Sequence, residues 1–380
     1  MLCALSGRET TGLSPILPVP GRHGTSDALA CLTGSVPLLT KPVSGAFLCY
    51  HIGHSALSGH FPQQTAVFAG NFPLEQHAMN TLQAHPFSTV RDLLRYAVTR
   101  FTREKLFFGH GSENAFDEAA YLILHTLSLP LDRLEPFLDA TLLPEETEAV
   151  MTIIDRRVTE RIPAAYLTNE AWLQGYSFYV ERGVIIPRSF LAELIVEQFA
   201  PWVSDPDGIT DILELCTGSG CLAIMLADRF ANATVDAVEL SPAALGIAQT
   251  NINRYGMKDR IQLHHADLYD GIPEKRYQLI VTNPPYVNQS SMDTLPPEYL
   301  HEPQMALAGG FDGMDIVRRI VYTAGERLTD DGLLIVEIGN EAENAMAAFP
   351  ELELTWLSTS GGDDRVFLLT AGQLKGLKKA

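Results

Sequence analysis

The tetrapeptide Asn283-Pro284-Pro285-Tyr286 combines a side-chain amide, a stiff turn and an aromatic ring. It follows the β-branched, apolar run 279–282, which is typical of a buried parallel strand. The two prolines end this strand in one fixed direction, because neither can donate to a sheet hydrogen bond. Ligands of open α/β sheets bind just beyond the carboxyl ends of the strands. The segment therefore predicts a site for a planar group that carries an NH2, such as a carboxamide or an exocyclic base amine. A plain proline-rich loop is the alternative.

A glycine turn between a strand and a helix forms a second candidate site. The run 212–215 predicts a short buried strand, and 221–230 predicts an apolar helix. The turn between them consists of Cys216, Thr217, Gly218, Ser219 and Gly220. Its glycines let the backbone approach a ligand without interference from a Cβ atom. Taken alone, this pattern also fits a dinucleotide-binding fingerprint, so it does not decide the cofactor.

Three carboxylates near strand ends narrow the choice of cofactor. Glu239 follows the predicted strand 234–238, where its carboxylate could accept both hydroxyls of a ribose. Asp267, after the third strand, could lie beside an adenine. Glu214 would face a diphosphate unfavourably, but it suits the ammonium and sulfonium charges of S-adenosylmethionine. Because no cluster of basic residues is present to neutralise a dinucleotide's phosphates, we favour the methyl donor over a nicotinamide cofactor.

A methyl donor above these strand ends gives the tetrapeptide a chemical role. An amide nitrogen is a poor nucleophile, because its lone pair is delocalised into the carbonyl group. If the Asn283 oxygen and the Pro284 carbonyl each accept one N–H, the nitrogen is held while its lone pair turns toward the methyl group. Tyr286 would pack on the planar group, and the released proton would leave to water. Catalysis would then rest on positioning and on electrostatic stabilisation of the transition state.

The elements that position these residues alternate between strands and helices. Further strands are predicted over 261–263 and 333–338, and 352–358 with 365–369 predict a closing antiparallel pair. Helices are predicted from 241 to 253 and from 313 to 328. This alternation indicates an α/β fold with a doubly wound, mostly parallel sheet, which we assign to residues 188–380.

The chain before this sheet has a different texture. Helical periodicity predicts helices from 89, over 117–127 and over 144–161, with a short one over 131–138, so 85–163 is assigned as a helical domain for substrate recognition. Strand formers and glycines over 166–187 predict a β-hairpin, and 164–187 is assigned as the linker. His110 lies in a turn between two helices, where a structural role is favoured over a catalytic one.

Composition limits the possible partners. The formal net charge of −19 repels phosphate backbones, which disfavours nucleic acid and favours a basic protein. No run of apolar residues is long enough to predict a membrane span. The five cysteines form no Cys-x-x-Cys pair and no zinc spacing, so we expect no metal site and a reduced, cytoplasmic protein.

Residues 1–78 carry few charges and show no persistent helical or strand period. This composition favours a disordered or loosely attached segment. An alternative hypothesis is that translation begins at Met79 and that 1–78 is an extension assigned in error.

Several separated motifs together resemble the glutamine side-chain amide methyltransferases of the HemK/Prm family. The segments 283–286 and 216–221 resemble the family as a whole. Three further segments point, together with Cys216, to one of its branches: Gly109-His110-Gly111, 166–172, and His301-Glu302-Pro303 before Ala308-Gly309-Gly310. The resemblance covers roughly residues 85–375. It implies a seven-stranded class I methyltransferase domain that uses S-adenosylmethionine, with the donor contacted by Glu214, the 216–221 turn, Glu239 and Asp267, and the glutamine contacted by 283–286. Cys216 points to the branch that modifies ribosomal protein L-three of the large subunit.

Three other functions fit parts of the sequence. The release-factor branch of the same family differs mainly in its substrate. Adenine-amino methyltransferases of DNA or RNA use a similar Asn-Pro-Pro-aromatic turn, but the acidic charge and the lack of a basic target-recognition region oppose that reading. A non-catalytic ribosome-assembly factor would bind the donor without turnover, which the intact Asn283 and glycine turn argue against.

Overall fold

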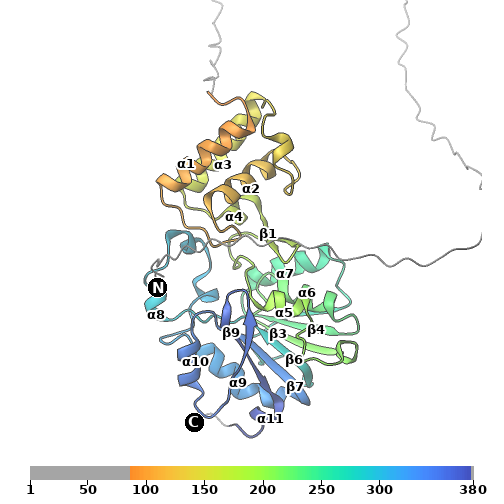
Figure 1. The fold of residues 1–380 in the computed structure, drawn as a ribbon. Helices are drawn as coiled ribbons and strands as arrows, with labels where there is room; N and C mark the ends of the chain where they lie inside the picture. The colour runs from red at the N-terminus through yellow and green to blue at the C-terminus, as the bar shows by residue number, and fades with distance from the viewer. Residues whose placement is uncertain (1–85, 378–380) are drawn as a thin grey trace, which may run out of the picture. The chain divides into compact units, whose positions relative to one another are not determined.

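The computed structural model describes residues 86–377, which begin with a helical region and a short hairpin (Figure 1). The expectations about residues 1–78 lie outside the described residues. The first elements are α1 (Val90–Arg103), α2 (Ala115–Thr126), η1 (Glu135–Phe137), α3 (Pro144–Thr159), α4 (Ala164–Thr168), β1 (Glu170–Leu173) and β2 (Tyr176–Tyr179). Buried side chains from the three long helices, among them Leu93, Leu122 and Ile154, form one apolar core. The predicted helical region followed by a hairpin is confirmed.

Two local predictions in this region are wrong. Tyr166 lies in α4 instead of the hairpin, and its hydroxyl donates to the Val184 carbonyl at 2.5 Å. The β-branched run 184–186 pairs with no strand; it packs over the glycine turn described below. Of the segment 131–138, only the three residues of η1 are helical, and a proline in its first turn limits the hydrogen bonds it can make.

The remaining described chain forms a seven-stranded sheet with helices on both faces. Its helices are α5 (Leu191–Val196), η2 (Pro206–Gly208), α6 (Cys221–Arg229), α7 (Pro242–Arg254), α8 (Gln289–Met292), η3 (Pro297–His301), η4 (Gln304–Ala306), α9 (Asp315–Arg327), α10 (Ala342–Ala348) and α11 (Ala371–Leu374). Its strands are β3 (Asp211–Leu215), β4 (Thr234–Glu239), β5 (Ile261–His265), β6 (Tyr277–Thr282), β7 (Leu328–Glu337), β8 (Thr355–Thr359) and β9 (Gly362–Thr370). The doubly wound α/β fold is confirmed.

Strand order explains where a ligand site forms. The sheet runs β5-β4-β3-β6-β7-β9-β8, and β9 is antiparallel to both of its neighbours. The chain thus builds outward from β3 in one direction and then returns to add β6 on the other side. In sheets of this kind the crevice at the reversal point, outside the carboxyl ends of the strands, is the usual ligand site. Here that point lies between β3 and β6, which end at Leu215 and Thr282.

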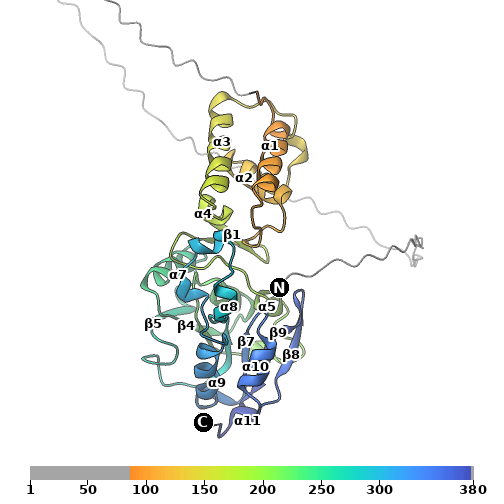
Figure 2. The ribbon, with the colours of Figure 1, turned by 90° about the vertical axis from the view of Figure 1, so that its left-hand side faces the viewer.

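Alternate residues of the central strands serve two separate cores. Ile212, Leu279 and Ile335 pack with α5 and α6 on one face. Leu213, Ile280 and Leu334 pack with α9, α10 and α11 on the other, the face seen in Figure 2. Since both faces of each strand are covered, the strands read as nearly continuous apolar runs. This double burial makes the sheet a rigid frame for the residues at its carboxyl edge.

Candidate active site

A cavity of about 820 Å³ lies at the carboxyl ends of β3, β4, β6 and β7. Every residue that the sequence analysis assigned to a site lines it, with the exception of Gly220. The carboxylates near the strand ends, the glycine turn and the Asn-Pro-Pro-Tyr segment are thus brought together in one place. Within residues 86–377, no cluster of His, Cys, Asp or Glu side chains is arranged to hold a metal ion, and no helix is both long and apolar enough to cross a membrane.

The glycine turn adopts backbone conformations that bring it close to its neighbours. Gly218 has φ +57°, and a Cβ atom there would lie 3.5 Å from Ile185 Cγ2. Gly220 has φ +79° and precedes α6, where a Cβ atom would meet Ala248 Cβ at 3.3 Å. Gly220 therefore serves the close packing of α6 against α7, while the preceding residues of the turn face the cavity. Cys216 also has positive φ, at 61°, and burial raises the pKa of its thiol, so the thiol is not a reactive nucleophile.

Glu239 is held by backbone groups on both sides. Its Oε2 accepts the Gly218 N–H at 2.8 Å, and its Oε1 accepts the Ser241 N–H, also at 2.8 Å. Each carboxylate oxygen retains a lone pair for a further donor, such as a sugar hydroxyl. Asp267 lies nearer the solvent with its side chain 43% exposed, and Arg319 contacts it at 3.0 Å.

Two polar groups, one in the turn and one at the end of β3, are available to a ligand. The Ser219 hydroxyl is buried and lines the cavity, yet no described residue bonds to it. Buried hydroxyls are nearly always paired, so this one indicates a missing partner. Glu214 is also buried, accepts a hydrogen bond from the Thr217 hydroxyl, and has its pKa raised by burial to about 8. A cationic ligand beside Glu214 would favour its ionised form.

If Glu214 contacts a cationic methyl donor, as the sequence analysis expects, its raised pKa makes donor binding depend on pH. A donor cation prefers the carboxylate, which forms fully only above pH 8, so affinity should rise from pH 6 to pH 8 by up to about tenfold per unit and then level off. Calorimetry in buffers of different ionisation enthalpy should also show proton release near pH 7. Glu214→Gln serves as the control, since it should bind more weakly and lose the pH dependence. A wild-type affinity that does not change over this range would place the cation elsewhere.

Asn283 immediately follows β6, and its side chain is oriented by a backbone carbonyl. Its Nδ2 donates to the Arg188 carbonyl at 3.4 Å, which fixes the identity of the two ends of the amide. No donor within residues 86–377 bonds to Asn283 Oδ1 or to the Pro284 carbonyl. Both acceptors belong to residues that line the cavity, as the amide-holding arrangement requires.

The Asn-Pro-Pro-Tyr segment is clamped from outside by the segment 307–313. The Val287 N–H donates to the Leu307 carbonyl at 2.8 Å, and the Gly309 N–H donates to the Val287 carbonyl at 2.9 Å. A Cβ atom on Gly309 would lie 2.7 Å from Tyr286 Cα, so only glycine allows this approach. The Tyr286 ring rests on Gly339, where an added Cβ atom would lie 2.6 Å from the ring.

The sequence analysis missed Glu337, a buried carboxyl at the end of β7 that lines the cavity. The pairing of Thr282 with Val336 places Glu337 level with Asn283 on the neighbouring strand. Ser189 donates to Glu337 Oε2 at 2.5 Å, and burial raises the pKa of Glu337 to about 7. Its position at a strand end was the available signal, the same one that identified Glu239.

Also missed was an ion pair behind Asn283, between the partly exposed Arg188 and the buried Glu302. Arg188 donates to both carboxylate oxygens of Glu302 at 2.7 and 2.6 Å, and Glu302 also accepts the Ile186 N–H at 2.9 Å. Burial opposes ionisation of Glu302, but the His110 ring, 3.4 Å away, and the hydrogen bonds from Arg188 lower its pKa to about 2. The pair therefore fixes the backbone at 186–188, whose carbonyl at Arg188 orients Asn283. His110 packs on Tyr299, with 4.5 Å between the ring centroids, as expected of a structural residue.

Comparison with known proteins shows which protein family the chain is similar to. Residues 193–310 match the methyltransferase small domain model. The chain is 59% identical to the ribosomal protein uL3 glutamine methyltransferase of Burkholderia pseudomallei, over 77% of this chain and 98% of that protein. It is 55% identical to the protein of the same name from Bordetella pertussis, over 75% and 96% of the two chains. It is 53% identical to the protein of the same name from Neisseria meningitidis serogroup A, over 79% of this chain and 99% of that protein.

Proposed function

This chain belongs to the ribosomal protein uL3 glutamine methyltransferase family, and we propose that it methylates the side-chain amide nitrogen of a glutamine in uL3. The proposal rests on one observation above the others. A single cavity joins the glycine turn and its carboxylates to the free acceptor groups of Asn283 and Pro284. It therefore has room for a methyl donor at one end and an amide at the other.

The residues around the turn fit S-adenosylmethionine, which supplies a methyl group activated on a sulfonium centre. Glu239 would accept the ribose hydroxyls through lone pairs that its two backbone contacts leave free. Glu214 would hold the cationic end, and Ser219 would gain the partner its buried hydroxyl lacks. Asp267 would lie beside the adenine, steadied by Arg319. Cys216, Thr217 and Gly218 would form the wall on which the donor lies.

The acceptor end fits a carboxamide. Asn283 Oδ1 and the Pro284 carbonyl would each accept one N–H of the glutamine, while Pro285 keeps the turn stiff and Tyr286 packs against the planar amide. As the nitrogen becomes positive in the transition state, both acceptors hold its protons more tightly. The proton would then leave to water. This arrangement lowers the barrier through orientation and electrostatics, without a strong base.

The rest of the molecule is consistent with a protein substrate. The acidic balance of the chain, with a net charge of −19, would attract a basic ribosomal protein and repel bare nucleic acid. We assign substrate recognition to the helical region within 85–163 and methyl transfer to 188–380, joined by the hairpin in 164–187. Contact with uL3 would take place in the cytoplasm, before or during ribosome assembly.

Intact-mass analysis of purified substrates tests the proposal. Incubation with S-adenosylmethionine should add the mass of one methyl group to uL3 and none to a peptide chain release factor at the same concentration. The three relatives reported above are named for uL3, which favours it as the substrate. Methylation of the release factor alone would assign the chain to the other substrate.

A further inference from the structure

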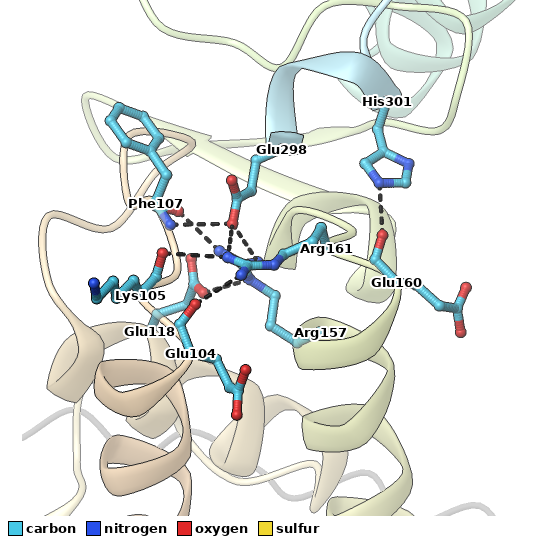
Figure 3. Close-up of polar contacts among 9 residues, drawn as sticks. All are labelled: Glu104, Lys105, Phe107, Glu118, Arg157, Glu160, Arg161, Glu298 and His301. Carbon is cyan, nitrogen blue, oxygen red and sulfur yellow. Dashed lines mark hydrogen bonds and ion pairs between the residues drawn. The ribbon is translucent and has the colours of Figure 1, made fainter. Parts of the chain in front are cut away.

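The segment 297–303, which we call the bridging segment, contacts both the helical region and the active-site cavity. It consists of η3 and the two residues after it, and it lies in the chain between the Asn-Pro-Pro-Tyr segment and α9. Tyr299 and Pro303 line the cavity. Glu298 and His301 instead bond to the helical region, as Figure 3 shows. The bridging segment is therefore placed to relate one part of the molecule to the other.

Among the residues of the bridging segment, Glu298 has several hydrogen bonds to the helical region. Its side chain is fully buried, and its Oε1 accepts three hydrogen bonds from the helical region (Figure 3). The donors are the Phe107 N–H at 3.0 Å, Arg157 Nη1 at 3.3 Å and Arg161 Nη1 at 3.3 Å. A buried carboxylate is tolerated only when charge and hydrogen bonds compensate it, so these donors hold Glu298 in one place.

The two arginines are themselves tied into the helical region. Arg157, on α3 and only 1% exposed, also donates to Glu118 Oε1 at 2.6 Å and to the Phe107 carbonyl at 2.9 Å. Arg161 donates to the Glu104 carbonyl at 2.7 Å, just past the end of α1. All three long helices thus connect to Glu298 through directional, charge-assisted bonds.

Neighbouring residues of the bridging segment add further contacts. His301 bonds through Nε2 to the Glu160 carbonyl at 2.8 Å. The Tyr299 ring lies 5.7 Å from the Phe107 ring, measured between centroids. Glu302 contacts His110 at 3.4 Å and also holds Arg188, whose carbonyl orients Asn283. A continuous series of contacts therefore connects the helical region to the Asn283 side chain.

We propose that Glu298 is a positioning residue that sets the helical region relative to the cavity, and so selects intact uL3 over a short glutamine peptide. This inference rests on the proposed function. A folded substrate must meet the helical region and deliver its glutamine to Asn283 at the same time, so a misplacement of about 1 Å can cost roughly 100-fold in rate. A short peptide needs only the cavity and is indifferent to where the helices lie.

Glu298→Gln tests this by comparing two substrates. The glutamine modified in uL3 is first located by mass spectrometry, and a short peptide around it is synthesised. We expect kcat/KM for intact uL3 to fall by about tenfold or more, mainly through kcat, because the glutamine is delivered out of position. The variant should keep the wild-type kcat/KM for the peptide and the wild-type donor affinity measured by calorimetry. Gln249→Ala, which breaks an exposed contact with Asn253 on α7, outside both the helical region and the cavity, should change none of these values.

Arg161→Gln provides a second variant should Glu298→Gln fail to fold, because Arg161 is partly exposed and supplies one of the three donors. This variant should also lower kcat/KM for intact uL3 relative to kcat/KM for the peptide, but to a smaller extent. Equal losses for the two substrates would show that the cluster only maintains the fold, and unchanged uL3 kinetics would show that its contacts are dispensable; either result overturns the inference. A wild-type protein that leaves uL3 unmodified would overturn the proposed function itself.

Discussion

Replacing Asn283 with alanine is expected to reduce turnover by roughly 100-fold or more, while affinity for S-adenosylmethionine stays nearly unchanged. Asn283 Nδ2 donates to the Arg188 carbonyl at 3.4 Å, which leaves Oδ1 free for the contact that we propose with the glutamine amide. The bond from the glutamine N–H to Oδ1 would strengthen only as the glutamine nitrogen gains positive charge. Its loss therefore lowers kcat more than it raises KM. Steady-state kinetics with uL3, together with donor calorimetry, separate the two effects.

Asn283→Asp is the informative companion variant. It retains an acceptor oxygen but loses the N–H that the Arg188 carbonyl binds, and it adds a negative charge near Glu337. Partial activity is expected, between those of the wild type and the alanine variant. If Asn283→Ala methylates uL3 at the wild-type rate, the amide-holding mechanism is wrong.

Replacing Glu239 with alanine is expected to weaken donor binding by about 2–4 kcal/mol, through the loss of the two charge-assisted hydrogen bonds that we propose it makes to the ribose. The substitution also removes the acceptor for the N–H groups of Gly218 and Ser241. Melting temperatures without donor therefore need to accompany the calorimetry, so that distortion of the turn can be recognised. Glu239→Gln retains an acceptor and should have an intermediate affinity. An unchanged affinity in Glu239→Ala would remove this residue from the donor site.

The parallel strands and their ends could be predicted because the necessary information is local. The run 279–282 was assigned from four residues, of which three are apolar and three are β-branched, and it lies in β6, which begins two residues earlier. The two prolines mark the end of the strand. Asn283 was assigned to the site because it comes directly after that strand. The same local signal fails for 184–186, which has the composition of a strand but no neighbouring strand to pair with. Composition reports that a segment suits a sheet, whereas pairing depends on the rest of the fold.

The supporting residues could not be predicted, because their partners lie far away in the chain. Arg188 and Glu302 are separated by 114 positions, and Arg157 and Glu298 by 141. No periodicity or spacing connects such pairs; only the folded chain brings them together. Glu337 was only partly predictable. Its place at a strand end follows from the local sequence, but its proximity to Asn283 depends on β7 lying next to β6.

Tandem mass spectrometry of uL3 after reaction with S-adenosylmethionine tests the central claim most directly. With the wild-type protein, the added methyl group should be found on the side-chain amide nitrogen of a glutamine. With Asn283→Ala, the same glutamine should remain unmodified over the same time. A methyl group on a lysine, on the main chain or on an accompanying nucleic acid would contradict the account, as would equal modification by both proteins.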